Sequence, residues 1–405
     1  MVGKILRAMQ VNTGKNFIPL AALVAIWSVS AIASLPGLAI SPILNDLDKI
    51  FPSASELEVD MLESLPSLLI IPFMLLAGRW SITGNKMALL VVGTSIFLIG
   101  GFGSLLARKL WELIFLGAVI GVGAGIIIPL STGLVVDYFT GDYRVRQLGI
   151  SSAINNLTLV IATSLTGYLA DIEWHYAFAV YLLPAITLLL VPALSHTKPE
   201  PEPEGGAQRR QTTLRMNVII GLMLFYFAIT YFSLIVTFNT SYLAAEVGMD
   251  ATTSGIIISI FFLAIMTPGL ALNLIVKLLG RMVNVWSLVV MGLGLILMSL
   301  PHPTILHLTV GAALAGLGYG VMQPVIYDKA ATNAPPHLST LALSLVMAVN
   351  YFAILVAPFM VTGVDKLFGE SSPSFAFLFN GLATLVLAAV ALLLVKRSRV
   401  FGSDD

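Results

Sequence analysis

The chain is a succession of apolar stretches, each about as long as a lipid bilayer's hydrocarbon core is thick. An α-helix rises about 1.5 Å per residue, so about 20 mostly apolar residues cross a core of roughly 30 Å. Such stretches fill nearly all of the 405 residues, of which 58% are apolar and 10% are charged. An ordinary soluble domain has roughly a quarter of its residues charged. The pattern excludes a water-soluble enzyme and predicts an all-α integral membrane protein with twelve transmembrane helices.

A polar segment divides the predicted spans into two groups of six. The spans are placed at residues 17–40, 61–79, 87–107, 110–136, 148–170, 175–194, 216–239, 254–278, 283–300, 304–328, 338–362 and 374–395. The dividing segment contains the run from Pro199 to Gly206, whose alternating prolines and glutamates cannot form a packed element. We therefore expect an N-terminal six-helix bundle at 1–194, a cytoplasmic linker at 195–215 and a C-terminal six-helix bundle at 216–405.

The distribution of basic residues predicts how these spans are oriented. Cytoplasmic loops of membrane proteins are enriched in lysine and arginine. With twelve spans both termini lie on one side, and of the 21 basic residues, 17 fall on that side and four on the other. We therefore expect a multi-pass protein of the bacterial inner membrane with both termini in the cytoplasm.

The two groups of spans share an internal repeat with a shift of 195 residues. The first copy comprises Gly121, Gly123, Gly125, Pro129 and Asn155, and the second comprises Gly316, Gly318, Gly320, Pro324 and Asn350. Closely spaced glycines let helix backbones approach each other in lipid. The repeat predicts two pseudo-symmetric bundles with a solute site between them, near the middle of the membrane.

Twelve spans, a six-plus-six repeat and a long central loop together resemble the major facilitator superfamily. The family's signature follows the second span, where this chain has Gly84 and Lys86 at matching positions but lacks the signature's acidic residue. The corresponding loop of the second half keeps the pair Gly280-Arg281. The resemblance extends in part to the drug/proton antiporters of this family, although Gly117 stands where those proteins have an arginine.

The resemblance implies that spans one, four, seven and ten line a central cavity, with contributions from their neighbours. The polar and aromatic candidates for substrate binding are Trp27, Asn155, Asn156, Tyr226, Tyr231, Tyr319, Gln323, Asn350 and Tyr351. Each amide has the alternative role of an interhelical hydrogen bond, and each tyrosine that of packing or of an interface belt. As a set they describe an uncharged, amphipathic cavity, which disfavours multiply anionic substrates.

Carboxylates inside a membrane are costly and usually serve a function. Asp328, four residues after Pro324, is the candidate for proton coupling; the alternative is an interfacial carboxylate paired with Lys329 or with loop bases. Asp137 is expected to pair with Arg79, Arg144 or Arg146 as a cytoplasmic gate, or simply to be solvated.

The sequence lacks the motifs expected for ATP-driven transport, thiol chemistry and metal binding. We find no Gly-x-x-x-x-Gly-Lys-Ser/Thr motif for driving transport with ATP, no cysteine, and no metal-ligand spacing among the five histidines. We therefore expect no catalytic residues, no cofactor and no metal.

The sequence thus predicts a secondary active transporter that exports amphipathic small organic compounds in exchange for protons. Its expected partners are a small-molecule substrate, protons and the lipid bilayer, with no nucleic acid, and we expect a monomer. An importer or facilitator of a neutral solute such as a sugar, nucleoside or peptide stays open, as does a non-transporting receptor or partner subunit.

Overall fold

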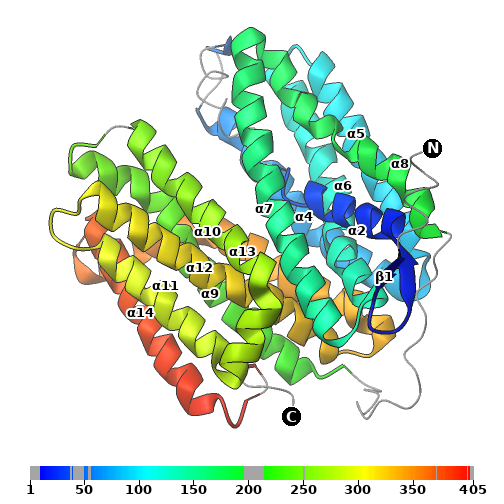
Figure 1. Cartoon of the computed structure of the whole chain (residues 1–405). Helices are drawn as coiled ribbons and strands as arrows, with labels where there is room; N and C mark the ends of the chain where they lie inside the picture. Colours follow the sequence, from blue (N-terminus) through cyan, green and yellow to red (C-terminus); the bar gives the residue numbers. More distant parts are fainter. Residues whose placement is uncertain are drawn as a thin grey trace. The chain divides into compact units, whose positions relative to one another are not determined.

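The computed structural model describes residues 10–36, 39, 50–52, 56–195, 214–249, 251–370, 372–398 and 400–401, and most of them are helical (Figure 1). The elements of the first half are β1 Gln10–Asn12, β2 Phe17–Pro19, α2 Leu20–Ile32, α4 Glu56–Thr83, α5 Lys86–Leu106, α6 Leu110–Tyr138, α7 Gly141–Ile172, η2 Trp174–Leu182 and α8 Pro184–Ser195. Those of the second half are α9 Met216–Glu246, α10 Ala251–Leu279, η3 Gly280–Met282, α11 Val283–Met298, α12 Ile305–Thr332, η4 Pro336–Leu338, α13 Ser339–Phe368 and α14 Pro373–Leu394. The predicted linker at 195–215 lies almost entirely outside the described residues.

The twelve predicted spans are confirmed. Within the described residues, ten helical segments are apolar and long enough to cross a membrane. One of them, Thr253–Met298, contains both α10 and α11, and the shorter apolar helix α2 supplies the remaining span. The fold is that of an all-α membrane protein with twelve helices in two six-helix bundles.

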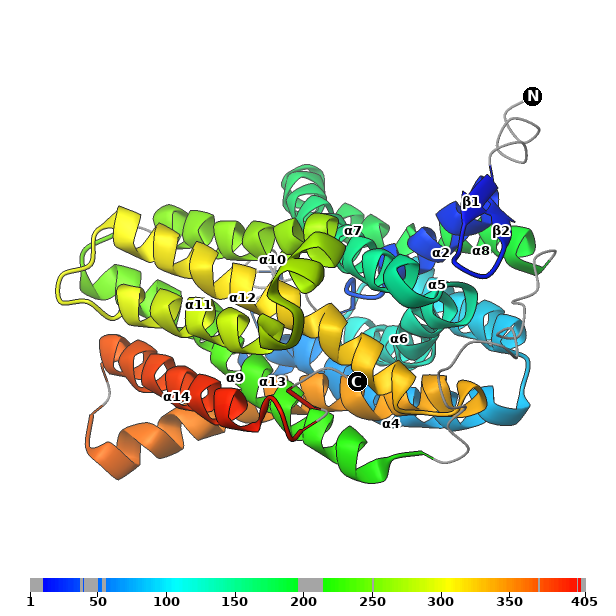
Figure 2. The same ribbon diagram turned by 60° about the horizontal axis from the view of Figure 1, so that its bottom comes forward.

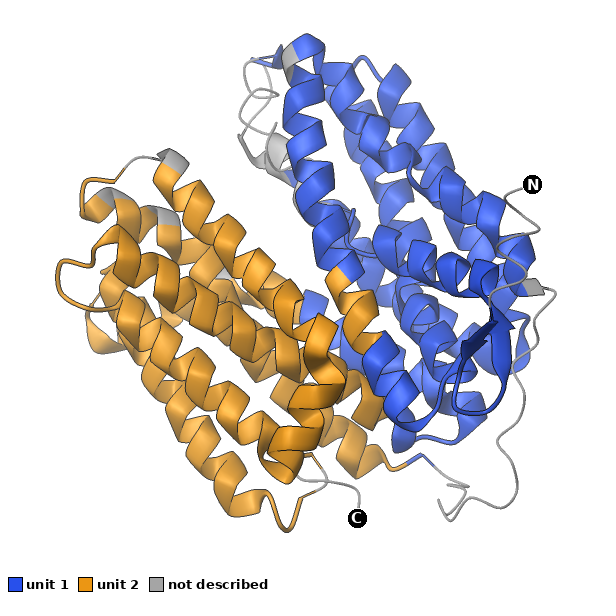
Figure 3. Ribbon diagram, viewed as in Figure 1, with its two compact units in different colours: residues 1–147, 154–214, 331–351 blue, residues 148–153, 215–330, 352–405 orange. Residues whose placement is uncertain are grey.

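The chain forms two compact units (Figure 3). Unit 1 comprises residues 1–147, 154–214 and 331–351; unit 2 comprises residues 148–153, 215–330 and 352–405. Within unit 1, α6 packs against α4 and α5, and α2 packs against α8. Within unit 2, α11 lies along α14, which also contacts α9 (Figure 2). Each unit therefore has its own helical core.

The glycine repeat makes equivalent contacts in the two units. A side chain at Gly125 in α6 would collide with the backbone of Ile70 in α4. A side chain at Gly320 in α12 would collide with the backbone of Ile265 in α10. The two isoleucines are 195 positions apart in the sequence, as are the two glycines. The repeat seen in the sequence is thus a repeat of helix packing.

On each of these two helices, the glycine two residues earlier contacts a second neighbouring helix. Gly123 of α6 lies against Phe97 of α5, and Gly318 of α12 lies against Ser287 of α11. Glycines two residues apart point to different sides of a helix, so alternate positions admit different partners. The spacing therefore lets α6 and α12 each approach two neighbouring helices closely.

Three local features differ from the predicted spans. Residues 10–19 form an antiparallel hairpin with Val11 opposite Ile18, and Gly14 in its turn has a φ of 86°. The first helix ends at Ile32, short of the predicted residue 40. The sixth span begins as the 3₁₀ helix η2 and continues as α8, because Pro184 has no N–H for a helical bond across the junction.

Candidate substrate and coupling site

A network of hydroxyl and amide groups joins α9 to α12 inside unit 2. The hydroxyls of Tyr226 and Tyr327 lie 2.6 Å apart. The side-chain amide of Gln323 donates to both, at 3.1 Å to Tyr226 and 3.3 Å to Tyr327. Tyr319 donates to Tyr226 over 3.5 Å. The structure therefore brings together three of the predicted binding residues: Tyr226, Tyr319 and Gln323.

Helical spacing explains why α12 contributes so much to this network. Tyr319, Gln323 and Tyr327 are four residues apart, so they lie on one face of the helix. The sequence analysis missed Tyr327, although its spacing from Gln323 was a signal that could have found it. It also missed Ser152 of α7, whose hydroxyl donates to the Gln323 side-chain oxygen at 3.3 Å.

Tyr231, on α9, does not join this network through any recorded hydrogen bond. Its side chain is 5% exposed, and its buried hydroxyl interacts with the side chain of Asn380 in α14. The hydroxyl lies within electrostatic reach of Asp365 in α13. Tyr231 thus faces a second polar region of unit 2.

Two predicted binding residues have partners inside unit 1. The indole N–H of Trp27 donates to the side-chain oxygen of Gln147 at 3.0 Å. The backbone carbonyl of Asn155 accepts from the Ser34 hydroxyl at 3.0 Å. The side-chain oxygen of Asn155 is buried and has no hydrogen-bond partner among the described residues. Trp27 therefore joins α2 to α7 through a side-chain hydrogen bond, and Asn155 has a buried side-chain acceptor.

The remaining predicted residues are all partly buried. They are Asn156, Asn350, Tyr351 and the coupling candidate Asp328. Asp328 directly follows Tyr327, so it projects from α12 about 100° around the helix from that tyrosine. Partial burial is compatible with a binding or coupling role and with a packing role.

The predicted gate residue Asp137 forms an ion pair at the end of α6 with a residue that we did not predict. Its carboxylate lies 2.7 Å from the Nζ of Lys86, and the two side chains are 18% and 21% exposed. Because α5 begins where its antiparallel neighbour α6 ends, Lys86 in the first turn of α5 faces Asp137. Arg79 and Arg146 are exposed, and Arg144 is 9% exposed.

The side chains of this network are uncharged hydrogen-bonding groups. Tyrosine hydroxyls and a glutamine amide both donate and accept hydrogen bonds, so their network can be rearranged around a bound molecule. The described residues include no cluster of three or more histidine, cysteine, aspartate or glutamate side chains suited to a metal ion. Twelve apolar helices with an internal polar network are typical of a membrane transport protein.

Comparison with known proteins gives the family. The sequence pattern of the Major Facilitator Superfamily matches residues 20–238 and again residues 218–403. The chain therefore belongs to the Major Facilitator Superfamily, as the resemblance predicted. The family and the fold support a transporter that binds small molecules in a lipid bilayer.

Individual relatives are similar over shorter stretches or only in fold. The chain is 29% identical over 119 residues to the multidrug transporter protein MdtP of Bacillus subtilis (strain 168), covering 29% of this chain and 21% of MdtP. It is 26% identical over 116 residues to multidrug resistance protein 3 of the same organism, covering 28% of this chain and 23% of that protein. The chain thus aligns with only about a fifth of the length of these relatives.

A likeness in fold extends over nearly the whole chain. The structure of the proton:xylose symporter XylE bound to 6-bromo-6-deoxy-D-glucose superimposes with a TM-score of 0.69 at 17% identity. The match covers 93% of this chain and 96% of that one. At this identity the likeness concerns the fold alone.

Proposed function

We propose that this protein is a secondary active transporter that exports amphipathic small organic compounds in exchange for protons. The observation that carries the proposal is the network of Tyr226, Gln323 and Tyr327 between α9 and α12. It is uncharged, and it combines aromatic surface with groups that donate and accept hydrogen bonds. Such a set of side chains suits a substrate with an apolar body and a few polar groups. The two Bacillus subtilis relatives, both named for multidrug transport or resistance, point in the same direction.

Coupling is assigned to Asp328. It is a carboxylate within a predicted membrane-spanning helix and directly follows Tyr327 of the network, and carboxylates in such helices usually serve a function. Lys86 and Asp137 act as a gate whose ion pair forms and breaks during the cycle. In this account the halves 1–194 and 216–405 rock about a central site, and the protein works as a monomer in a bacterial inner membrane with cytoplasmic termini.

The second candidate function is an importer or facilitator of a neutral solute such as a sugar, nucleoside or peptide. It is favoured by the similarity in fold to a proton:xylose symporter and by the absence of charge in the Tyr226 network. Counterflow without a proton gradient would favour this candidate. The third, a non-transporting receptor or partner subunit, predicts binding of a ligand that the protein never moves.

The test begins with a thermal-shift screen of purified protein against a chemically diverse panel, because a ligand that binds the folded state raises the apparent melting temperature. The same ligands are then measured on Gln323→Leu, which removes the three hydrogen bonds of the amide to Tyr226, Tyr327 and Ser152, and on Trp286→Leu, an exposed residue of α11 outside the network. We expect amphipathic ligands to lose about tenfold in affinity or more with Gln323→Leu only. Unchanged binding in Gln323→Leu would contradict the proposed site.

A further inference from the structure

An open apolar groove lies on unit 1 at the turn that joins α5 to α6. Its volume is about 360 Å³. Gly103 and Leu106 line it from α5, and Phe115 and Leu116 line it from α6. We call it the α5–α6 groove, and its volume falls within the range of small-ligand sites.

The groove belongs to the exposed surface of unit 1. Leu106, Trp111 and Phe115, which all line it, are 63–65% exposed. Ile99 and Phe102, on the preceding turns of α5, continue this exposed apolar surface. Both helices are apolar and long enough to cross a membrane. In a bilayer the apolar group that this surface meets is therefore the acyl chain of a lipid.

Local bonds hold the groove in shape. The carboxylate of Glu112 accepts from the backbone N–H groups of Arg108 and Lys109, at 2.8 and 3.2 Å. The Ala107 carbonyl oxygen lies 3.0 Å from Nε2 of His175 in η2. The turn is thus bonded to both α6 and η2, so the groove does not have to rearrange to receive an acyl chain.

Two basic side chains lie beside the groove. Arg108 and Lys109 form the turn just before α6, and both are exposed. Of the carboxylates near the turn, Glu112 is bonded to the backbone and Glu173 lies 3.1 Å from the ring of His175. Among the described residues, no ion pair is recorded for either basic side chain. Both positive charges are therefore available to an anion from outside the chain.

The placement of these two residues also sets them apart. In the predicted orientation the turn lies on the side of the membrane that has four of the 21 basic residues, and it holds two of the four. Basic residues set orientation by accumulating on the opposite, cytoplasmic side. Orientation therefore does not explain Arg108 and Lys109, whereas contact with an anionic lipid headgroup does.

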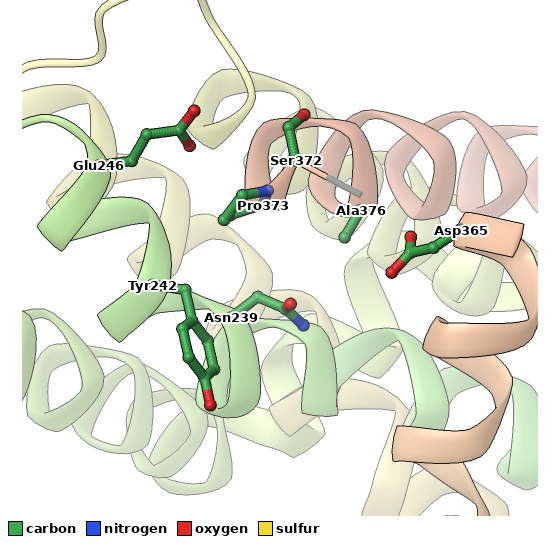
Figure 4. A pocket seen from close by; sticks show the side chains of 7 residues that line it. All are labelled: Asn239, Tyr242, Glu246, Asp365, Ser372, Pro373 and Ala376. Carbon is green, nitrogen blue, oxygen red and sulfur yellow. The ribbon is translucent and has the colours of Figure 1, made fainter. Parts of the chain in front are cut away.

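The pocket at the end of unit 2 has the opposite character (Figure 4). It has a volume of about 420 Å³ and lies where α9 and α13 end and α14 begins. Glu246 and Asp365 line it, and none of the described residues that line it is basic. Lys366 follows Asp365 and is exposed, but it does not line that pocket. Because carboxylates repel a lipid phosphate, Lys366 serves as a matched basic residue outside the proposed lipid site.

We propose that the α5–α6 groove binds a phospholipid whose headgroup carries a net negative charge. One acyl chain lies in the groove against Leu106, Phe115 and Leu116, and the phosphate lies on Arg108 and Lys109. A guanidinium can hold a phosphate through two parallel hydrogen bonds, and an ammonium adds a point charge. A zwitterionic lipid has the same chains and the same phosphate, but the two cations repel the positively charged amine of its headgroup.

This assignment is independent of the proposed transport function. It needs neither a transported substrate nor coupling through Asp328, so it can be tested on a protein that moves nothing. It also does not depend on which side of the membrane the turn faces, provided that both leaflets contain the same lipids.

The test uses bromine atoms on lipid acyl chains, which quench the fluorescence of a tryptophan on contact. Full-length protein is reconstituted in two equimolar mixtures of phosphatidylglycerol and phosphatidylcholine, with the brominated chains on the first lipid in one mixture and on the second lipid in the other. Both mixtures therefore have the same headgroups and the same bromine content. The signal of Trp111, one of five tryptophans, is the difference between the wild type and Trp111→Phe.

We expect brominated phosphatidylglycerol to quench Trp111 severalfold more strongly than brominated phosphatidylcholine does. Equal quenching by the two lipids would mean ordinary contact with bulk lipid only, and would overturn the proposal.

Matched variants locate the binding. The double variant Arg108→Gln/Lys109→Gln removes both charges at exposed positions, and its Trp111 should be quenched equally by the two lipids. Lys366→Gln removes one exposed charge elsewhere and should keep the wild-type preference. A preference that survived in the double variant, or that Lys366→Gln abolished, would contradict the assignment to this groove.

Discussion

The close packing of α6 on α4 yields a prediction with a built-in control. At Gly125 an added Cβ would lie 2.8 Å from the Ile70 carbonyl oxygen, where ordinary contacts begin at 3.4 Å. A backbone oxygen cannot rotate away, so Gly125→Ala must push the two helices apart. Overpacking of this kind costs roughly 1–3 kcal/mol, offset by up to about 1 kcal/mol from the better helix propensity of alanine.

Gly167→Ala in α7 is the matched control, because an added Cβ there meets no atom within 4 Å. It should leave the free energy of unfolding unchanged or raise it by up to about 1 kcal/mol. The assay is unfolding in mixed detergent micelles with increasing dodecyl sulfate, followed by circular dichroism. Gly320→Ala, the equivalent position of unit 2, should behave like Gly125→Ala. If both variants were as stable as Gly167→Ala, the glycine repeat would not be a device for close helix packing.

Three further changes test local contacts. Lys86→Met should lower the free energy of unfolding by about 1 kcal/mol, and a double-mutant cycle with Asp137→Leu should recover most of it as coupling. Burial raises the pKa of Asp365, so this carboxyl keeps its proton to a higher pH in the folded state than in the unfolded state. The free energy of unfolding should therefore fall as pH rises through that raised pKa, and melting curves of Asp365→Asn should lack this dependence. Glu246 and the exposed Lys366 are the charged neighbours whose titration should be checked by substitution in the same series. Gln147→Leu should cost about 1 kcal/mol and shift indole emission, because it leaves the partly buried N–H of Trp27 without its acceptor.

Most of the fold could be predicted because it depends on properties of single segments. Span length follows from bilayer thickness, and the repeat is visible as glycines at a constant shift. Those glycines also proved to contact partners at the same shift, Ile70 and Ile265. The hairpin at residues 10–19 was missed because its strands are only three residues long and its turn depends on local bonds such as that from the Gly14 N–H to the Asn12 side chain.

The candidate sites were predictable only where one helix carries them. Tyr319 and Gln323 lie on one face of α12, so helical spacing brought them to the same place. The partner of Asp137 was chosen from arginines, whereas the pairing depends on where α5 starts relative to the end of α6, and that position selects Lys86. The hydrogen bond from Ser152 to Gln323 joins residues 171 positions apart along the chain, and no pattern within one segment could reveal it.

Proton-coupled export is tested most directly in liposomes that contain the purified protein and a ligand identified by thermal shift. An imposed pH gradient should drive uphill movement of the ligand by the wild type and by the surface control Glu370→Gln. Asp328→Asn should still exchange ligand across the membrane without a gradient, but should lose the gradient-driven accumulation. If Asp328→Asn accumulated ligand as well as the wild type, the coupling assignment would be wrong; if the wild type moved ligand equally well with and without the gradient, the protein would be a facilitator.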